Sequence, residues 1–241
     1  MANIGFTTGS LYKSDIPLDE RIRLYHSLGA SAIELSFLTP SQLSAFQLSG
    51  QIEKYIHKFS SVSIHAPCKD IRYDGNKETQ EVIEKLRALC HRLPITGLVL
   101  HPDTIDDFEV LETSGLPFLL ENMDRRKASG THPIQFREFK RKYGFGFVLD
   151  VQHAYEHDST MQLARELIDV MGDRLKHMHV SGYNDLEIHV PVYCAINKEA
   201  ITAILRISPN VPKILEGILT ENIQDSIVKE LNYVQNFERD W

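Results

Sequence analysis

The feature of the sequence that most constrains its fold is a short apolar run that recurs and ends on histidine, aspartate or glutamate. In residues 145–153, such a run reaches Asp150, and His153 follows three residues later. The run is too short for a buried helix and is rich in aromatic and β-branched residues, so we interpret it as a buried parallel strand. Asp150 is then expected at the carboxyl end of this strand. Other runs end in the same way on His65, His101, Glu121, His179 and Glu216.

Apolar runs of this kind alternate with segments of helical periodicity. Strands are predicted at residues 3–8, 32–36, 62–65, 96–101, 116–121, 145–150, 174–180 and 211–216. Helices are predicted at residues 17–28, 40–58, 77–93, 106–113, 131–143 (with Thr131 as N-cap), 159–171, 199–207 and 221–237. Eight strand–helix units without a Pro/Gly/Ser-rich linker, in a chain of 241 residues, have the size of one (β/α)8 TIM barrel. We therefore predict a single α/β domain over residues 1–241.

A doubly wound open sheet is the alternative fold. Such a sheet usually carries the phosphate-binding pattern G-x-G-x-x-G after its first strand. The segment from Gly5 to Gly9 reads Gly-Phe-Thr-Thr-Gly and does not match that pattern. This difference favours the barrel.

The composition narrows the functional class. A hydrophobic content of 42% and a charged content of 24% are typical of a soluble globular protein. No apolar run approaches the length of a membrane span, so we expect no membrane association and a cytoplasmic location. The three cysteines are scattered, which argues against a disulfide framework. The net charge of −7 argues against a large nucleic-acid-binding face.

The residues at the predicted strand ends are of the types that bind metal. In a TIM barrel these ends converge on the face that carries the active site. One buried histidine is more often a hydrogen-bonded core residue than a ligand. Glu121, Asp150 and Glu216 are harder to explain without a ligand, because an unpaired buried carboxylate is costly and no matching set of basic residues is present. A metal site is therefore predicted. Six of the eleven histidines lie at or just beyond strand ends: His65, His101, His153, His177, His179 and His189.

The strand-end motifs resemble those of the xylose-isomerase-like barrel superfamily, and most of all those of endonuclease IV, the metal-dependent AP endonuclease family. The resemblance extends over nearly the whole chain. In one position the sequence differs, because Glu187-Ile-His189 stands where the family has Asp-x-His. The matching motifs are His65-Ala-Pro, His101, Leu120-Glu121-Asn122, Leu149-Asp150-x-x-His153, His179 and Ile214-Leu215-Glu216.

The resemblance to endonuclease IV implies a centre of three divalent metal ions, with zinc expected. The first ion would be held by His65, His101 and Glu121. Glu121 would bridge to a second ion, completed by Asp150, His179 and Glu216. A third ion would be held by His153, Glu187 and His189. Such an arrangement suits hydrolysis of a phosphoester.

The ligands of the second site alone match the sugar isomerase and epimerase branch of the superfamily. There a single ion, often manganese, polarises the sugar, and paired carboxylates such as Glu121 and Glu216 move protons. These two glutamates are our predicted catalytic residues. The additional histidines favour the hydrolase over a sugar or sugar-phosphate isomerase. A third possibility is a metal-stabilised binding protein without catalytic activity.

Three further residues receive structural interpretations. Glu34 ends the second predicted strand and is expected to pair with a donor on a loop. His177 precedes His179 by two residues and is expected on the same side of its strand, either orienting Asp150 or Glu216 or lying in the core. Cys68 is interpreted as a buried structural thiol rather than a soft metal ligand.

Substrate contacts are predicted among basic residues near the strand ends. Arg125, Arg126 and Lys127 follow Glu121, and Lys69 and Arg72 follow His65-Ala-Pro. Such side chains could meet a phosphate, although a charge run is more often solvated. The sequence has no long basic insertion interleaved with aromatic residues, so DNA is a weaker expectation than a small phosphoester or sugar phosphate. The oligomeric state is left open.

Overall fold

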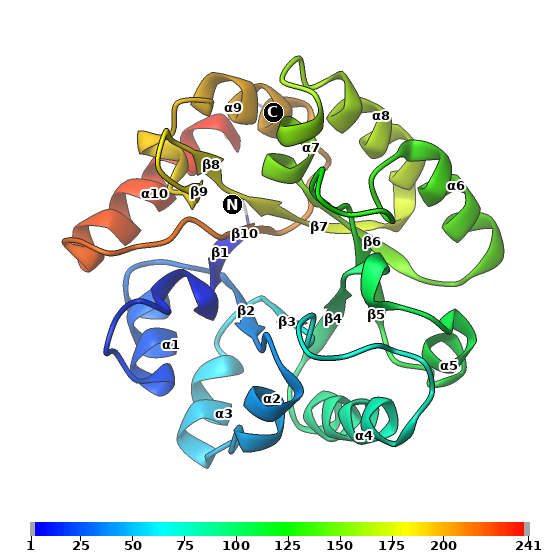
Figure 1. The fold of residues 1–241 in the computed structure, drawn as a ribbon. Helices are drawn as coiled ribbons and strands as arrows, with labels where there is room; N and C mark the ends of the chain where they lie inside the picture. Colours follow the sequence, from blue (N-terminus) through cyan, green and yellow to red (C-terminus); the bar gives the residue numbers. More distant parts are fainter. Residues whose placement is uncertain (1–2, 239–241) are drawn as a thin grey trace.

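The computed structural model describes residues 3–238, which form a closed barrel of eight parallel strands (Figure 1). Residues 1–2 and 239–241 of the predicted domain lie outside the described residues. Pairing of Ile4 with Lys213 closes the barrel between its first and last strands. The predicted (β/α)8 fold is thus confirmed. The barrel strands are β1 (Ile4–Thr7), β2 (Ala32–Ser36), β3 (Ser61–His65), β4 (Ile95–Leu100), β5 (Phe118–Glu121), β6 (Gly146–Asp150), β7 (Leu175–Val180) and β10 (Lys213–Leu215).

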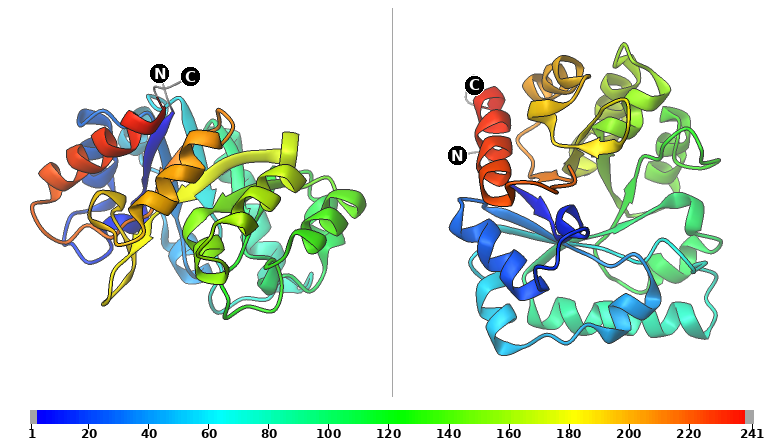
Figure 2. Two further views of the ribbon diagram at one scale, coloured as in Figure 1. Left: turned by 90° about the horizontal axis from the view of Figure 1, so that it is seen from above. Right: turned by 60° about the vertical axis from the view of Figure 1, so that its left-hand side comes forward.

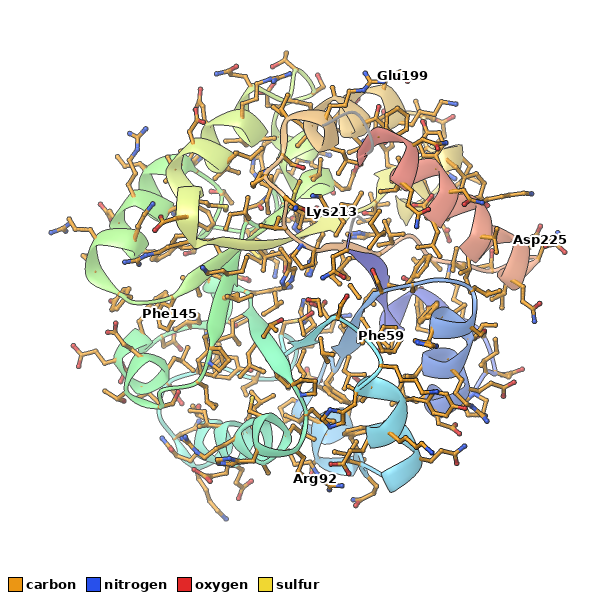
Figure 3. All side chains as sticks on the ribbon, turned by 180° about the vertical axis from the view of Figure 1, so that it is seen from behind. Phe59, Arg92, Phe145, Glu199, Lys213 and Asp225 are labelled. Carbon is orange, nitrogen blue, oxygen red and sulfur yellow. The ribbon has the colours of Figure 1, made fainter. Side chains whose placement is uncertain are left out.

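Helices surround the barrel, as the two views of Figure 2 show. Each packs an apolar face against the outer surface of the strands, whose outward side chains are buried by this layer. Figure 3 views the amino-terminal end of the barrel, where Lys213 begins β10 and Phe59 and Phe145 precede β3 and β6. The helices are α1 (Leu18–Ser27), α2 (Pro40–Ala45), α3 (Gly50–Ile56), α4 (Lys77–Arg92), α5 (Phe108–Thr113), α6 (Pro133–Lys142), α7 (Val151–His157), α8 (Gln162–Met171), α9 (Lys198–Ile207) and α10 (Ile223–Glu238).

The inside of the barrel is built in layers, because strand side chains alternate between the two faces of the sheet. Val99, Leu119 and Val148 form a small buried apolar cluster separate from the main core. Two residues further along these strands, the chain reaches His101, Glu121 and Asp150. The strand period therefore places the polar layer directly above an apolar layer, at the carboxyl end of the barrel.

The predicted helix at residues 40–58 is wrong, because the segment forms the two helices α2 and α3. Phe46 ends α2 with an extended backbone (ψ 123°). The side chain of Ser49 then accepts a hydrogen bond from the backbone N–H of Ile52 and caps α3. The apolar spacing continues across this break, which explains why the sequence resembled one amphipathic helix.

The segments beyond β6 and β7 also differ from the prediction. Helix α7 begins directly after Asp150, and the expected loop after β7 contains the antiparallel hairpin β8 (Gly182–Tyr183) and β9 (Ile188–Val190). This hairpin projects from the carboxyl end of the barrel (Figure 2, left). The predicted N-cap Thr131 lies one residue too early, because α6 begins after His132.

Glu230 of helix α10 forms hydrogen bonds to the segment that follows β9. The buried carboxylate accepts hydrogen bonds from the backbone N–H groups of Val192 and Tyr193, at 2.7 and 3.1 Å. Burial raises the pKa of Glu230 to about 7, although these two hydrogen bonds oppose the shift. The folded protein therefore holds a proton on Glu230 at pH values where the unfolded chain has lost it.

We expect this proton to make stability depend on pH. Between about pH 4.5 and pH 7 the unfolded carboxyl ionises first, so stability falls as the pH rises through this window, by roughly 3 kcal/mol. Glu230→Gln should remove that fall, while Glu199→Gln, on the exposed face of α9, should keep it. Urea unfolding of the three proteins at several pH values measures the difference. Parallel curves for wild type and Glu230→Gln would show that Glu230 is ionised throughout.

Candidate metal centre

The carboxyl ends of six neighbouring strands bring their polar side chains together. His65 ends β3, His101 follows β4, Glu121 ends β5 and Asp150 ends β6. Asp150 lies opposite His179 in the register of β6 and β7. Glu216 follows β10, whose Ile214 also lies opposite His179. The barrel thus assembles six of the predicted ligands at one end.

Three of these residues form a first cluster around one oxygen of Glu121. The Nε2 atoms of His65 and His101 lie 3.1 Å apart, and they lie 3.6 and 3.4 Å from Glu121 Oε2. His65 Nδ1 lies 3.0 Å from the carbonyl of Ala66, an acceptor that places the ring proton on Nδ1 and leaves the Nε2 lone pair free. Ligand atoms about 3.3 Å apart are expected around tetrahedral zinc with bonds near 2.05 Å. The spacing therefore fits a zinc-sized ion.

The second cluster lies around the other oxygen of Glu121. Oε1 is 2.9 Å from His179 Nδ1, which is itself 3.4 Å from Glu216 Oε1. One ligand atom each from Glu121, Asp150, His179 and Glu216 all lie within 4.8 Å of one another. Because its two oxygens face different clusters, Glu121 has the geometry of a bridging carboxylate.

Two carboxylate oxygens of these clusters have no hydrogen-bond partner in the described part of the protein. Among residues 3–238, Glu121 Oε2 and Asp150 Oδ2 are buried and have no hydrogen-bond partner. A buried carboxylate oxygen without a partner is costly. Divalent cations at the two clusters would satisfy both atoms, so the residues present fit a metal centre.

Electrostatics within the cluster lead to the same conclusion. Burial raises the pKa of Glu121, but the charge of His179 and the nearby imidazoles of His101, His179 and His65 outweigh it and hold this pKa well below its usual range. Burial, reinforced by the charges of Asp150 and Glu121, raises the pKa of Glu216 well above its usual value despite the opposing charge of His179. Without added cations, these carboxylates cannot all ionise at ordinary cost.

The predicted third site is only partly assembled. His153 and His189 meet edge to face with ring centroids 5.6 Å apart. Glu187 instead extends from the hairpin into solvent and forms a 2.6 Å ion pair with Lys13. The structure therefore pairs Glu187 with Lys13, 174 positions away in the sequence, and does not bring it to the other predicted ligands.

Asn122 positions two of these residues, a role that the sequence analysis did not assign. Its side chain bonds both backbone groups of Asp150, accepting from the N–H at 2.7 Å and donating to the carbonyl at 2.9 Å. Its own carbonyl lies 2.9 Å from His153 Nδ1. That contact leaves His153 Nε2 free as a possible ligand atom. The Leu-Glu-Asn motif therefore combines a ligand with the residue that orients its neighbours.

Glu34 and His177 lie inside the barrel, one layer below the metal centre. Glu34 is completely buried, accepts a hydrogen bond from Ser63 Oγ at 2.8 Å and lies 3.4 Å from His177 Nε2. It also contacts His179 Nε2 at 3.2 Å. The expected loop donor for Glu34 was wrong, since its partners are on β3 and β7. His177 contacts Glu34 and His179 rather than Asp150 or Glu216.

A cavity of about 1130 Å³ opens above the clusters. Of the predicted substrate contacts, Lys69, Arg126 and Lys127 line it, with Arg126 paired to Asp124 and Lys127 paired to Asp103. Arg125 is exposed and outside the lining, and Arg72 pairs with Asp106. The apolar residues that line the cavity include Tyr12, Ile16, Leu18, Phe37, Leu38, Phe46, Met123 and Ile218.

Glu216 is held against the hairpin by the glycine that follows it. A β-carbon on Gly217 would lie 2.5 Å from the backbone nitrogen of Pro191, so only glycine allows this approach. The N–H of Ile218 then donates to the carbonyl of His189 at 2.8 Å. This contact fixes Glu216 next to the end of β9 and close to His189.

No protein-family model matches the sequence, and no curated protein matches it. Solved structures with the same fold do match over nearly their whole length. Endonuclease IV from Thermus thermophilus superimposes with a TM-score of 0.71 at 14% identity, covering 99% of this chain and 100% of that chain. A D-tagatose 3-epimerase-like protein gives 0.69 at 14% identity, covering 99% and 97%.

A third structure comes from a different enzyme class. The probable 3-DHS dehydratase AsbF from Bacillus anthracis has a TM-score of 0.70 at 16% identity, covering 98% of this chain and 99% of that chain. The protein shares the TIM-barrel fold with these structures. Because an endonuclease, an epimerase and a dehydratase all share it, the likeness defines the fold and leaves the reaction to the site. No helix within residues 3–238 is both long enough and apolar enough to cross a bilayer.

Proposed function

We propose that the protein is a metal-dependent phosphoester hydrolase of the endonuclease IV type. The observation that carries this proposal is the division of Glu121 between two clusters, with Oε2 facing His65 and His101 and Oε1 facing His179. A sugar isomerase with one working ion needs the second cluster and leaves the first unexplained. Bound there, a pair of divalent ions would polarise a phosphoester and offset its charge.

Zinc is the proposed metal. The two clusters offer three imidazoles, and imidazole nitrogen suits zinc better than it suits the hard ions magnesium and calcium. Manganese is the alternative, because Asp150, Glu121 and Glu216 also offer carboxylate oxygens.

The surrounding residues support a phosphorylated substrate of limited size. Lys69 lines the cavity together with Arg126 and Lys127, which are ion-paired with Asp124 and Asp103 and still offer further N–H donors to a phosphate. Glu121 and Glu216 are the proposed catalytic carboxylates. Apolar side chains account for much of the remaining lining. We therefore favour a small phosphodiester or a sugar phosphate as substrate over a DNA duplex.

A sugar or sugar-phosphate isomerase is the second candidate. The observation in its favour is that Glu187 pairs with Lys13, so the predicted third metal site lacks its carboxylate. In that reaction Glu121 and Glu216, on either side of His179, would transfer a proton at a carbon next to the sugar carbonyl.

Metal content and two reactions separate the candidates. The protein should be purified without chelator or affinity-tag metal and analysed by elemental mass spectrometry. Two or three zinc ions per chain, together with EDTA-sensitive cleavage of bis(p-nitrophenyl) phosphate or an abasic-site duplex, would support the hydrolase. One ion, with solvent deuterium entering a sugar next to its carbonyl, would support the isomerase instead. A loaded protein that does neither reaction would be a metal-stabilised binding protein.

The role of the incomplete third metal site, at His153 and His189, can be tested by substitution. We expect His189→Ala to reduce hydrolysis by roughly 10²–10³-fold, because the variant removes one of the two imidazoles at the predicted third site, both of which line the cavity. His153→Ala should have a similar effect. The matched control is Glu187→Gln, whose side chain faces Lys13, so its kcat/KM should stay within about twofold of wild type. Near-wild-type turnover of both histidine variants would exclude a third ion from the mechanism.

A further inference from the structure

We propose that Cys68 is a thiolate ligand of the first metal ion, so that this ion is held by Cys68, His65, His101 and Glu121. The inference rests on the metal centre of the proposed function and adds a sulfur ligand to it. Ligand atoms of His65, Cys68 and His101 lie within 4.8 Å of one another. The same two imidazoles face the unpartnered Oε2 of Glu121. The two imidazoles therefore have a thiol and a carboxylate oxygen as neighbouring donors, so one ion at the imidazoles would have all four donor groups close by.

Backbone hydrogen bonds hold Cys68 close to His65 and His101. The N–H groups of Cys68 and Lys69 both donate to the carbonyl of Leu38, at 3.0 and 2.9 Å. The hydroxyl of buried Tyr73 donates to the carbonyl of Pro67 at 2.9 Å. Asp70 then turns the chain with a positive φ of 58°. The loop after β3 is therefore anchored on both sides of Cys68.

The surroundings of Cys68 differ from those of a structural thiol. A structural thiol is expected to be enclosed by apolar side chains. Cys68 is only half-buried and lines the cavity together with His65 and His101. Within residues 3–238 its thiol makes no hydrogen bond, whereas the thiol of Cys194 donates to the carbonyl of Pro191 at 3.2 Å. Cys68 is therefore not the buried thiol that the sequence analysis expected.

A thiolate at this place would change the character of the first site. Sulfur is a soft ligand that favours zinc over manganese or magnesium. With two imidazoles and the carboxylate of Glu121 it would give the ion four protein ligands, the number found in sites where zinc has no open position. The second site, which has only carboxylates and one imidazole, would then be the one that meets the substrate.

Cobalt(II) substitution tests this proposal directly. A cobalt–thiolate bond gives an intense near-ultraviolet charge-transfer band that imidazole and carboxylate ligands do not give. Wild-type protein loaded with cobalt should show this band, and Cys68→Ser should lose it and bind the first ion about tenfold more weakly or worse. Cys90→Ser and Cys194→Ser are the matched controls and should keep the band at full intensity.

Measuring cobalt content and phosphoester cleavage on the same samples separates the two proposals. If wild type binds two cobalt ions and cleaves substrate without showing the band, Cys68 is not a ligand and the hydrolase stands. If the band depends on Cys68 and no phosphoester is cleaved, the ligand assignment stands and the proposed function falls. If the band persists in Cys68→Ser, another cysteine is its source and the proposal is overturned.

Discussion

Replacing Glu121 with glutamine is expected to reduce kcat/KM for phosphoester hydrolysis by about 10³-fold or more, equivalent to roughly 4 kcal/mol of transition-state stabilisation. The reason is that one carboxylate serves both clusters, so a neutral amide weakens two metal sites at once. Glutamine has nearly the same shape, so the barrel should still fold. Elemental analysis of the variant should show fewer than two ions per chain under conditions that fill wild type.

The control for this variant is Glu138→Gln on the exposed face of α6. It makes the same chemical change far from the centre and should leave both metal content and kcat/KM unchanged. Wild-type metal content in Glu121→Gln would show that the two clusters do not share this carboxylate. Full activity in the variant would remove Glu121 from the mechanism altogether.

Removing the metal is expected to lower the melting temperature by roughly 8–16 °C. An ion present at a thousand times its dissociation constant stabilises the folded state by about 4 kcal/mol, and each kcal/mol shifts the melting temperature of a chain of this size by about 2–4 °C. Chelation also leaves buried Asp150 Oδ2 and Glu121 Oε2 without partners. Calorimetry before and after treatment with EDTA, followed by dialysis, measures the shift.

Returning zinc should restore the original melting temperature, whereas magnesium should not, because imidazole nitrogens dominate the first cluster. In Glu121→Gln, the melting temperature should change much less when the metal is removed and when zinc is returned. An EDTA-treated wild type that melts at the original temperature would mean that hydrogen bonds among the histidines and carboxylates satisfy the cluster without metal.

The sequence could predict the barrel and the gathering of most candidate ligands at one end of it, because both follow from local regularities. Strand alternation places Glu121 two residues after the core residue Leu119, and Asp150 two residues after Val148. Closure of the barrel then brings these carboxylates together whatever the details of the outer helices. The positions of residues that depend on strand register could therefore be predicted from the adjacent sequence.

Residues positioned by distant contacts could not be placed in this way. Glu187 is turned away by Lys13, and the orientation of Cys68 depends on the carbonyl of Leu38 in the preceding loop. Glu34 finds its partners across the barrel on β7. Each of these outcomes depends on the three-dimensional closeness of segments that no local pattern connects.

Asp150 divides its carboxylate between two tasks. One oxygen accepts the N–H of His153 at 2.8 Å and starts helix α7, while the other is left for the second cluster. A related chain that had lost its metal would still favour a short polar side chain such as Asp, Asn, Ser or Thr here to begin that helix. Glu216, which caps no helix, has no such second reason to be kept. When the function of related sequences is judged, a glutamate at position 216 is therefore the more informative sign of a working centre than the Asp-x-x-His motif.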